Sequence, residues 1–148
     1  MEDLSKKIIS KLPYGAGFLF VDDITYVDED RIVGNYTFRS DAPYYKWHFK
    51  HRSVTPGVLI IETMGQIGMV CHIVFLEKLY DSNVKFSPIL LNVELSFIKE
   101  VFPNEKLEVR SRKIYYRNGV LKSRLWLKNP LNEDCALGTY QVKLLNDE

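Results

Sequence analysis

Three polar residues of this 148-residue chain occupy apolar or aromatic surroundings and could do acid–base chemistry together. Glu62 and Gln66 lie within the apolar stretch 58–76, and His48 precedes that stretch between two aromatic residues. Because burial of an ionised carboxylate is costly, a Glu62 kept protonated could donate a proton, while a neutral His48 imidazole could accept one. Gln66 follows Glu62 by one helical turn, where its amide could hold the carboxyl. The residues therefore suggest general acid–base catalysis.

The apolar stretch predicts one long helix that positions Glu62. Thr55 suits the N-cap and Pro56 the first helical position, and the apolar pattern continues to about Leu79. At about 1.5 Å per residue this helix would be roughly 36 Å long. Its apolar residues fall on every face, so other elements must bury it on all sides. The backbone N–H groups near Gly57 would carry the positive end of the helix dipole and could stabilise a thioester oxyanion.

The remaining segments predict a sheet that covers this helix. Short β runs flank Asp28-Glu29-Asp30, and four further strand candidates follow at 89–98, 106–116, 120–128 and 135–145. Asn118-Gly119 predicts a type I′ hairpin. A short amphipathic helix ends before Pro13, and residues 40–55 form a long loop. We expect one α+β domain over residues 1–148, with a mostly antiparallel sheet of five or six strands curled around the long helix.

Composition argues against several classes of protein. Twenty Lys and Arg residues against 19 Asp and Glu residues give a net charge of +1, which offers no general reason to expect nucleic acid or membrane binding. Polar residues, among them His72, interrupt the apolar stretch and argue against a membrane span. Cys71 and Cys135 make no disulfide framework and have no metal-ligand spacing with the histidines. Residues 1–12 lack the apolar core of a signal peptide. We expect a cytoplasmic protein without metal or cofactor.

The segment from His48 to Gln66 reads HFKHRSVTPGVLIIETMGQ and resembles the signature of the 3-hydroxyacyl-[acyl-carrier-protein] dehydratases. That family has His-Phe, then Pro-Gly-Val-Leu, then Glu-Ala-Met-Ala-Gln at this spacing. Segments 12–22 and 97–107 resemble two of its other motifs, so the resemblance covers nearly the whole chain. It implies the hot-dog fold, in which a curved sheet wraps a long central helix.

The resemblance implies removal of water from a 3-hydroxyacyl thioester on a carrier protein, which gives the trans-2-enoyl product. His48 would take the α proton, and Glu62 would protonate the departing hydroxyl while the helix N-terminus polarises the carbonyl. The acid is Glu, as in the branch that only dehydrates, whereas the isomerising branch typically carries Asp. The oxyanion and substrate-binding positions would be Phe49, Pro56, Gly57, Val58 and Gln66.

The resemblance also implies an oligomer and an acidic protein partner. In relatives the His and Glu of one site come from two subunits, so we expect a homodimer, or a trimer of such dimers, with an acyl tunnel along the interface. The partner would be the acyl carrier protein, attracted by cations in a manner that salt weakens. Candidate cations are Lys46, Lys50, Arg52, Lys99 and Arg112.

The chain departs from the family in the loop after His48. Lys50-His51 and Ser53 stand where the family has Pro-Gly and Pro, and 104–105 read Asn-Glu instead of Gly-Asp. Since proline restrains the backbone, we expect a differently shaped loop and a role in fatty-acid synthesis or in a specialised route such as polyene or pigment synthesis. Two alternatives stay open. A hot-dog acyl thioesterase has no clear need for His48, and retention of both His48 and Glu62 argues against a non-catalytic partner of an active dehydratase.

Overall fold

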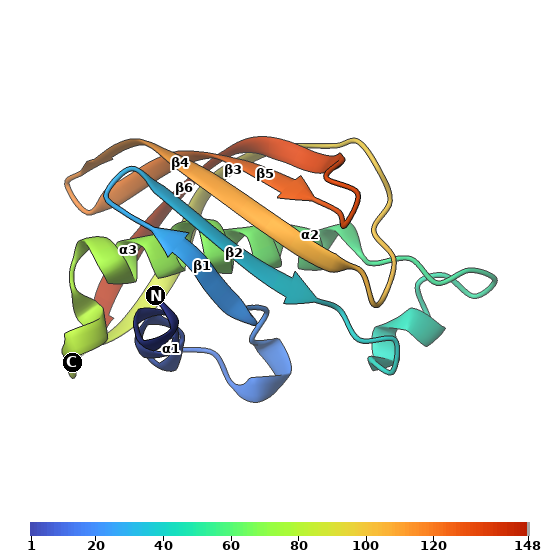
Figure 1. Cartoon of the computed structure of the whole chain (residues 1–148), viewed down its shortest axis with the longest axis horizontal. Coiled ribbons are helices and arrows are strands. Elements are labelled where there is room, and N and C mark those ends of the chain that lie inside the picture. The colour runs from blue at the N-terminus through green and yellow to red at the C-terminus, as the bar shows by residue number, and fades with distance from the viewer. Residues whose placement is uncertain (148) are drawn as a thin grey trace.

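A computed structural model describes residues 1–147 and shows one six-stranded antiparallel sheet wrapped around a central helix (Figure 1). The strand order is β1-β2-β4-β5-β6-β3. N-terminal helix α1 (Glu2–Ser10) lies against β1, and the Ser5 hydroxyl accepts a hydrogen bond from the Ile24 backbone N–H at 2.8 Å. The strands are β1 (Asp23–Val27), β2 (Arg31–Thr37), β3 (Lys85–Phe97), β4 (Lys106–Arg117), β5 (Val120–Lys128) and β6 (Asp134–Asp147). The predicted fold class is therefore confirmed.

Both predicted hairpins are present because their turn residues have the required chemistry. Asp28 Oδ1 accepts hydrogen bonds from the backbone N–H groups of Asp30 and Arg31, each at 2.8 Å, and so closes the β1–β2 turn. Asn118 and Gly119 have φ angles of 53° and 75°, and a type I′ turn between β4 and β5 requires positive φ at both positions.

The central helix runs from Gly57 to Leu76 in three pieces. Segment α2 (Gly57–Gly65) is α-helical, Gln66–Val70 is a π-helical turn named η3, and α3 (Cys71–Leu76) is α-helical again. These 20 residues are long and apolar enough to cross a membrane, yet 67% of their most apolar window is buried within the protein. The segment is the core helix of the fold.

Both predicted ends of this helix need correction. Pro56 is the N-cap and no side chain caps the helix, so the predicted Thr55 cap is wrong. The Thr55 hydroxyl instead lies 2.6 Å from the Tyr45 hydroxyl, which competes for it. The helix ends at Leu76 rather than near 79, and Lys78 then adopts a positive φ of 53°, a backbone geometry that follows many helix ends.

The prediction that the helix is buried on every face is wrong for its first turns within one chain. Met64, Ile67 and Ile73 are fully buried, at 0–1% exposure. Val58 is 71% exposed, and Glu62 is partly exposed. The sheet of one chain therefore leaves one side of α2 open.

The open side lies next to β3, which forms one edge of the sheet. Among residues 1–147 β3 pairs only with β6 and presents an unpaired backbone edge. It is 13 residues long, and its exposed hydrophobic side chains are Ile89, Leu90, Leu91 and Phe97. A long apolar edge strand is a template for pairing with another chain. The edge of β3 and the open side of α2 are adjacent, so together they form a surface that one chain leaves uncovered.

One buried histidine sits at the far end of the helix from its N-terminus. His72 is fully buried, and its Nε2–H donates to the Asp28 carbonyl at 2.9 Å. Its Nδ1 has no hydrogen-bond partner among residues 1–147. Burial lowers the pKa of His72, because a charged imidazole there would lose its hydration.

We expect the free energy of unfolding to decrease on acidification through His72. Its folded pKa lies below the ordinary value of about 6.5, so the unfolded state binds the extra proton first. The stabilisation is complete above that value and is lost as the pH falls toward the folded pKa, by up to about 1.4 kcal/mol per pH unit. Denaturant unfolding at pH 7 and pH 5 should show a smaller loss in His72→Gln than in the wild type. Equal losses would contradict this assignment.

Candidate active site

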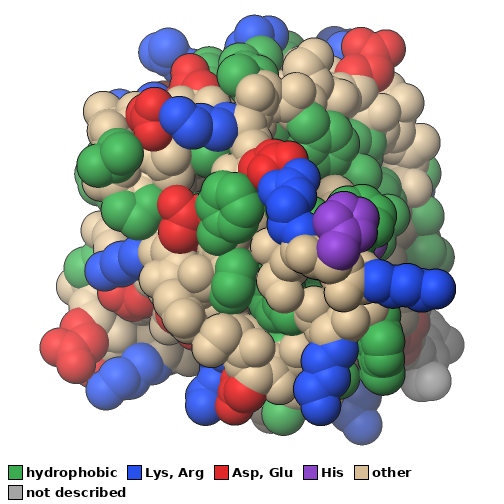
Figure 2. All heavy atoms as spheres, turned by 90° about the vertical axis from the view of Figure 1, so that its right-hand side faces the viewer, with side chains coloured by type: hydrophobic (Ala, Val, Ile, Leu, Met, Phe, Trp, Pro, Cys, Tyr) green, Lys and Arg blue, Asp and Glu red, His purple; other side chains and the backbone are tan. Residues whose placement is uncertain are grey.

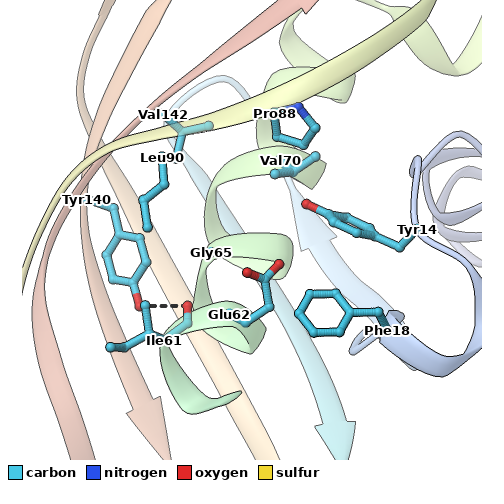
Figure 3. A pocket seen from close by; sticks show the side chains of 10 residues that line it. All are labelled: Tyr14, Phe18, Ile61, Glu62, Gly65, Val70, Pro88, Leu90, Tyr140 and Val142. Atoms are coloured by element: carbon cyan, nitrogen blue, oxygen red, sulfur yellow. Dashed lines mark hydrogen bonds between the residues drawn. The ribbon is translucent and has the colours of Figure 1, made fainter. Parts of the chain in front are cut away.

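Glu62 lines a cavity of about 180 Å³ between the central helix, β3 and β6. Figure 3 shows its carboxyl projecting from the helix into this space beside the Phe18 ring. Apart from Glu62 and two tyrosine hydroxyls, the side chains around it are apolar. The other lining residues are Tyr14, Phe18, Ile61, Gly65, Val70, Pro88, Leu90, Tyr140 and Val142.

The Gln66 side chain fixes the orientation of this carboxyl. Its Nε2 donates to Glu62 Oε2 at 2.9 Å and to the Phe18 carbonyl at 3.0 Å, and its Oε1 accepts from the Phe20 backbone N–H at 2.8 Å. Gln66 is fully buried, and all these bonds are made to the protein. The amide is thus placed to hold Glu62, as the helical spacing predicts, and its predicted contact with substrate stays a prediction.

Tyr140 braces the helix turn that carries Glu62. Its hydroxyl donates to the Ile61 carbonyl at 2.9 Å, and its ring packs against Gly65, where a Cβ would lie 3.4 Å from Cε2. The π-helical turn begins one residue after Gly65, with Cys71 N–H donating to the Gln66 carbonyl. Such turns often occur at functional sites. Tyr140 therefore restrains the helix turn that positions Glu62, although the two residues are far apart in the sequence.

His48 borders a second hollow, of about 330 Å³, at the N-terminal end of the helix. A carbonyl oxygen can only accept, so His48 Nδ1–H donates to the Val54 carbonyl, 3.0 Å away. In the neutral ring this leaves the lone pair on Nε2, which is the form required of a base. The Phe49 ring stacks on the imidazole with centroids 3.9 Å apart. The hollow also includes Gly57, Phe97, Ile98 and Val101.

One chain does not bring His48 and Glu62 into the same cavity, because the two hollows share no lining residue. The Glu62 cavity borders β3 at Pro88 and Leu90, and the His48 hollow borders its other end at Phe97. Both hollows therefore adjoin the edge strand, at opposite ends of it.

The start of α2 offers free backbone donors beside His48. Among residues 1–147 the N–H groups of Gly57 and Val58 donate no hydrogen bond, while the Pro56 carbonyl accepts from Leu59 and Ile60 at 3.0 and 3.2 Å. The first N–H groups of any helix lack internal partners. A Cβ on Gly57 would lie 3.3 Å from Phe97 Cζ, so the glycine lets this ring pack over the helix start.

Side-chain contacts hold the His48 loop where the family has prolines. The Arg52 guanidinium donates two hydrogen bonds to the Glu100 carboxylate, both at 2.6 Å, and this pairing lowers the pKa of Glu100. The Ser53 hydroxyl donates to the Tyr45 carbonyl at 2.9 Å. These bonds tie the loop to the β3–β4 connection and to its own first half.

Of the predicted carrier-binding cations, only some are free to meet a partner. Arg52 is paired as described, and Lys99 Nζ lies 2.6 Å from the carboxylate of Glu133. Lys46 and Lys50 are exposed and have no ion pair among residues 1–147. Figure 2 shows this end of the molecule, where basic, acidic and hydrophobic side chains are mixed instead of forming one basic face.

Arg112 lies apart from the other four cations. It is on the outer face of β4, directly opposite Arg31 on β2 and Arg124 on β5. At about 3.3 Å per residue, it is roughly 20 Å along the strand from Lys106, where β4 begins near the His48 end. The structure therefore does not group Arg112 with the His48 loop.

Sequence reasoning missed several residues that line the Glu62 cavity. Pro88, Leu90, Tyr140 and Val142 reach it from β3 and β6, and no local pattern marks them. Tyr14 lies in a segment that resembles a family motif, and this resemblance was the sequence signal that could have drawn attention to it. The motif does not indicate where the Tyr14 hydroxyl points.

The fold and the acid on its central helix define a hot-dog protein, and comparisons with known proteins narrow the class. The FabA-like domain model matches residues 12–128. A 3-hydroxyacyl-[acyl-carrier-protein] dehydratase FabZ from Geotalea uraniireducens is 30% identical over 115 residues, which cover 77% of this chain and 78% of the relative. The chain belongs to the FabA-like family of 3-hydroxyacyl-[acyl-carrier-protein] dehydratases.

Solved structures share the fold at low identity. The dehydratase heterocomplex ApeI:P from Xenorhabdus doucetiae superposes with a TM-score of 0.78 and 12% identity, over 94% of this chain and 91% of that chain. A hypothetical thioesterase from Streptococcus pneumoniae, solved with coenzyme A, gives a TM-score of 0.60 and 10% identity over 84% and 89%. At this identity the likeness concerns the fold alone.

We expect Gln66→Leu to destabilise the protein by about 2–4 kcal/mol, because it leaves the buried groups that Gln66 now satisfies without partners. Chemical denaturation measures this loss. The matched control is Gln141→Leu, which removes one amide hydrogen bond to the Tyr115 hydroxyl and should cost less than about 1 kcal/mol. Equal losses in the two variants would contradict the role assigned to Gln66.

Proposed function

We propose that this protein dehydrates 3-hydroxyacyl-[acyl-carrier-protein] to trans-2-enoyl-[acyl-carrier-protein], with His48 as base and Glu62 as acid. The observation that carries the proposal is an imidazole fixed with Nε2 free and a carboxyl held by an amide, at two hollows that adjoin one sheet edge. The dehydratase names of the curated relatives support the same reaction.

In the proposed mechanism the thioester carbonyl accepts hydrogen bonds from the free N–H groups at Gly57 and Val58, which stabilise the developing enolate. His48 Nε2 removes the proton on the α carbon. The electrons of that C–H bond form the α,β double bond while the C–O bond at carbon 3 breaks. Glu62 gives its proton to the departing oxygen, and the products are the enoyl thioester and water.

We propose that a homodimer assembles this site, or a trimer of such dimers. Antiparallel pairing of two β3 edges about a point near Val93 would set the Phe97 end of one strand opposite the Leu90 end of the other. The His48 hollow of one chain would then face the Glu62 cavity of its partner. Such two-fold pairing is self-complementary and would also cover the exposed Val58 side of α2.

The same proposal includes the carrier-binding residues and the cellular location. The acidic carrier would approach the His48 loop, where Lys46 and Lys50 are free, while Arg52 and Lys99 are neutralised in place. Phe49, Pro56, Gly57 and Val58 would contact the thioester end of the substrate. We place the protein in the cytoplasm as a single hot-dog domain that needs no cofactor, and in fatty-acid or related acyl-chain synthesis.

Incubation with a 3-hydroxyacyl-carrier substrate should lower the acyl mass by one water, as mass spectrometry detects. His48→Ala and Glu62→Gln should each reduce this rate by at least about 100-fold, the lower range for loss of a general acid or base. Release of free carrier thiol would point instead to the thioesterase alternative. An intact substrate with a folded dimer would favour the non-catalytic partner.

The same two variants test the composition of the site. If His48 and Glu62 of one site come from different chains, a mixed dimer of His48→Ala and Glu62→Gln chains contains one intact site. Random exchange of subunits should then restore roughly a quarter of the wild-type activity. No recovery after verified exchange would place both residues of each site on one chain.

We expect Lys46→Ala and Lys50→Ala to raise KM for a carrier-bound substrate but not for the same acyl group on free pantetheine. Exposed cations act mainly by steering an acidic partner, so added salt should shrink the difference between variant and wild type. Arg112→Ala is the matched control, because Arg112 lies outside the loop region. A rise in KM for both substrates would mean that the lysines shape the site itself.

A further inference from the structure

The cavity beside Glu62 contains two tyrosine hydroxyls that the proposed reaction does not use. Glu62 is bound by Gln66, and the Tyr140 hydroxyl is bound to the Ile61 carbonyl. The Tyr14 hydroxyl has no hydrogen-bond partner among residues 1–147. Figure 3 shows it pointing at the helix, between Val70 and Glu62, inside the cavity.

Its surroundings keep this phenol in the protonated form. Burial raises the pKa of Tyr14, so it remains an O–H donor at any physiological pH. The neighbouring side chains Phe18, Val70 and Pro88 offer it no acceptor. A cavity of about 180 Å³ is large enough to hold water, which can satisfy the hydroxyl while the site is empty.

An acyl chain in this cavity would take the place of any water that binds the hydroxyl. With the reacting carbons at Glu62 and the thioester in the facing His48 hollow, the distal carbons would fill the rest of the Glu62 cavity, which extends to Val70. Val70 is eight residues beyond Glu62, or about 12 Å along the helix axis. The far part of the chain would therefore meet the Tyr14 hydroxyl. An alkyl chain would leave that donor buried without a partner, which is unfavourable, whereas an oxygen acceptor would satisfy it.

We propose that Tyr14 is a specificity-determining residue that selects 3-hydroxyacyl chains carrying a neutral oxygen acceptor, such as a keto, hydroxyl or ether oxygen, in their distal part. This inference rests on the proposed dehydratase function and names the class of its substrate. A distal carboxylate is disfavoured because the lining residues include no cation that could compensate a buried negative charge. Tyr14 would touch the bound chain away from the reacting atoms, so it sets preference rather than chemistry.

The test compares pairs of carrier-linked 3-hydroxyacyl substrates of equal length, one saturated and one with a keto group moved stepwise along the distal carbons. The wild-type dimer should prefer one keto position by about tenfold in kcat/KM. Tyr14→Phe should reduce this ratio to about one, mainly by faster turnover of the saturated chain. A general loss of folding would lower both rates and leave their ratio unchanged.

Tyr80→Phe is the matched control, since Tyr80 loses the same hydroxyl outside the cavity, where its ring stacks on Phe75. It should keep the wild-type ratio. An identical ratio in the wild type and in a Tyr14→Phe variant with unreduced rates overturns the inference, as does a wild type without preference at any keto position.

Failure of the proposed function can be told apart from failure of this inference. If the wild type dehydrates no substrate, calorimetry with the matching saturated and keto enoyl-pantetheine thioesters measures the cavity directly. Tighter binding of a keto ligand that Tyr14→Phe abolishes would support the inference although the reaction is another one. Equal affinities, or no binding of either ligand, would overturn it.

Discussion

An apolar helix of 20 residues is stable in water only when other elements cover it, and the sheet of one chain covers it incompletely. The sheet curves over the helix from β1 to β3 and stops there (Figure 1). Beside this edge the first turns of α2 are only partly covered, with Val58 71% exposed. Both hollows of the candidate site lie at this incompletely covered edge. The exposed part of the core helix and the candidate site therefore occupy the same region of the fold.

Polar groups inside the apolar core are stabilised by specific partners, and these partners also give the site its geometry. Gln66 connects the helix to segment 18–20 and holds Glu62 at 2.9 Å. Tyr140 reaches the Ile61 carbonyl from β6. An amide or hydroxyl in such surroundings is strongly favoured in the one arrangement that satisfies it. The carboxyl of Glu62 is therefore oriented before any substrate arrives.

The loop that carries His48 reaches a fixed geometry by a different route. Where the family has Pro-Gly and Pro, this chain has Lys50-His51 and Ser53, and it uses the Arg52–Glu100 pair and the Ser53 hydroxyl to hold the segment. Hydrogen bonds to exposed groups are weaker restraints than a proline ring, and they respond to salt and pH. This loop thus keeps the orientation of the imidazole while its rigidity depends on side chains.

The sequence by itself determined most of the elements and the family. Periodicity marked the long helix and four of the strands, turn residues marked both hairpins, and the His48-to-Gln66 segment marked the family. These features are local, so a pattern of neighbours suffices to indicate them.

The Thr55 cap failed because Tyr45, ten residues away, competes for the hydroxyl. Only the tertiary structure decided that His48 and Glu62 of one chain open into different hollows, that Tyr140 and Leu90 line the Glu62 cavity, and that β3 is an edge strand among residues 1–147. Those facts depend on strand order and on side chains brought together from distant segments, and no local pattern encodes them.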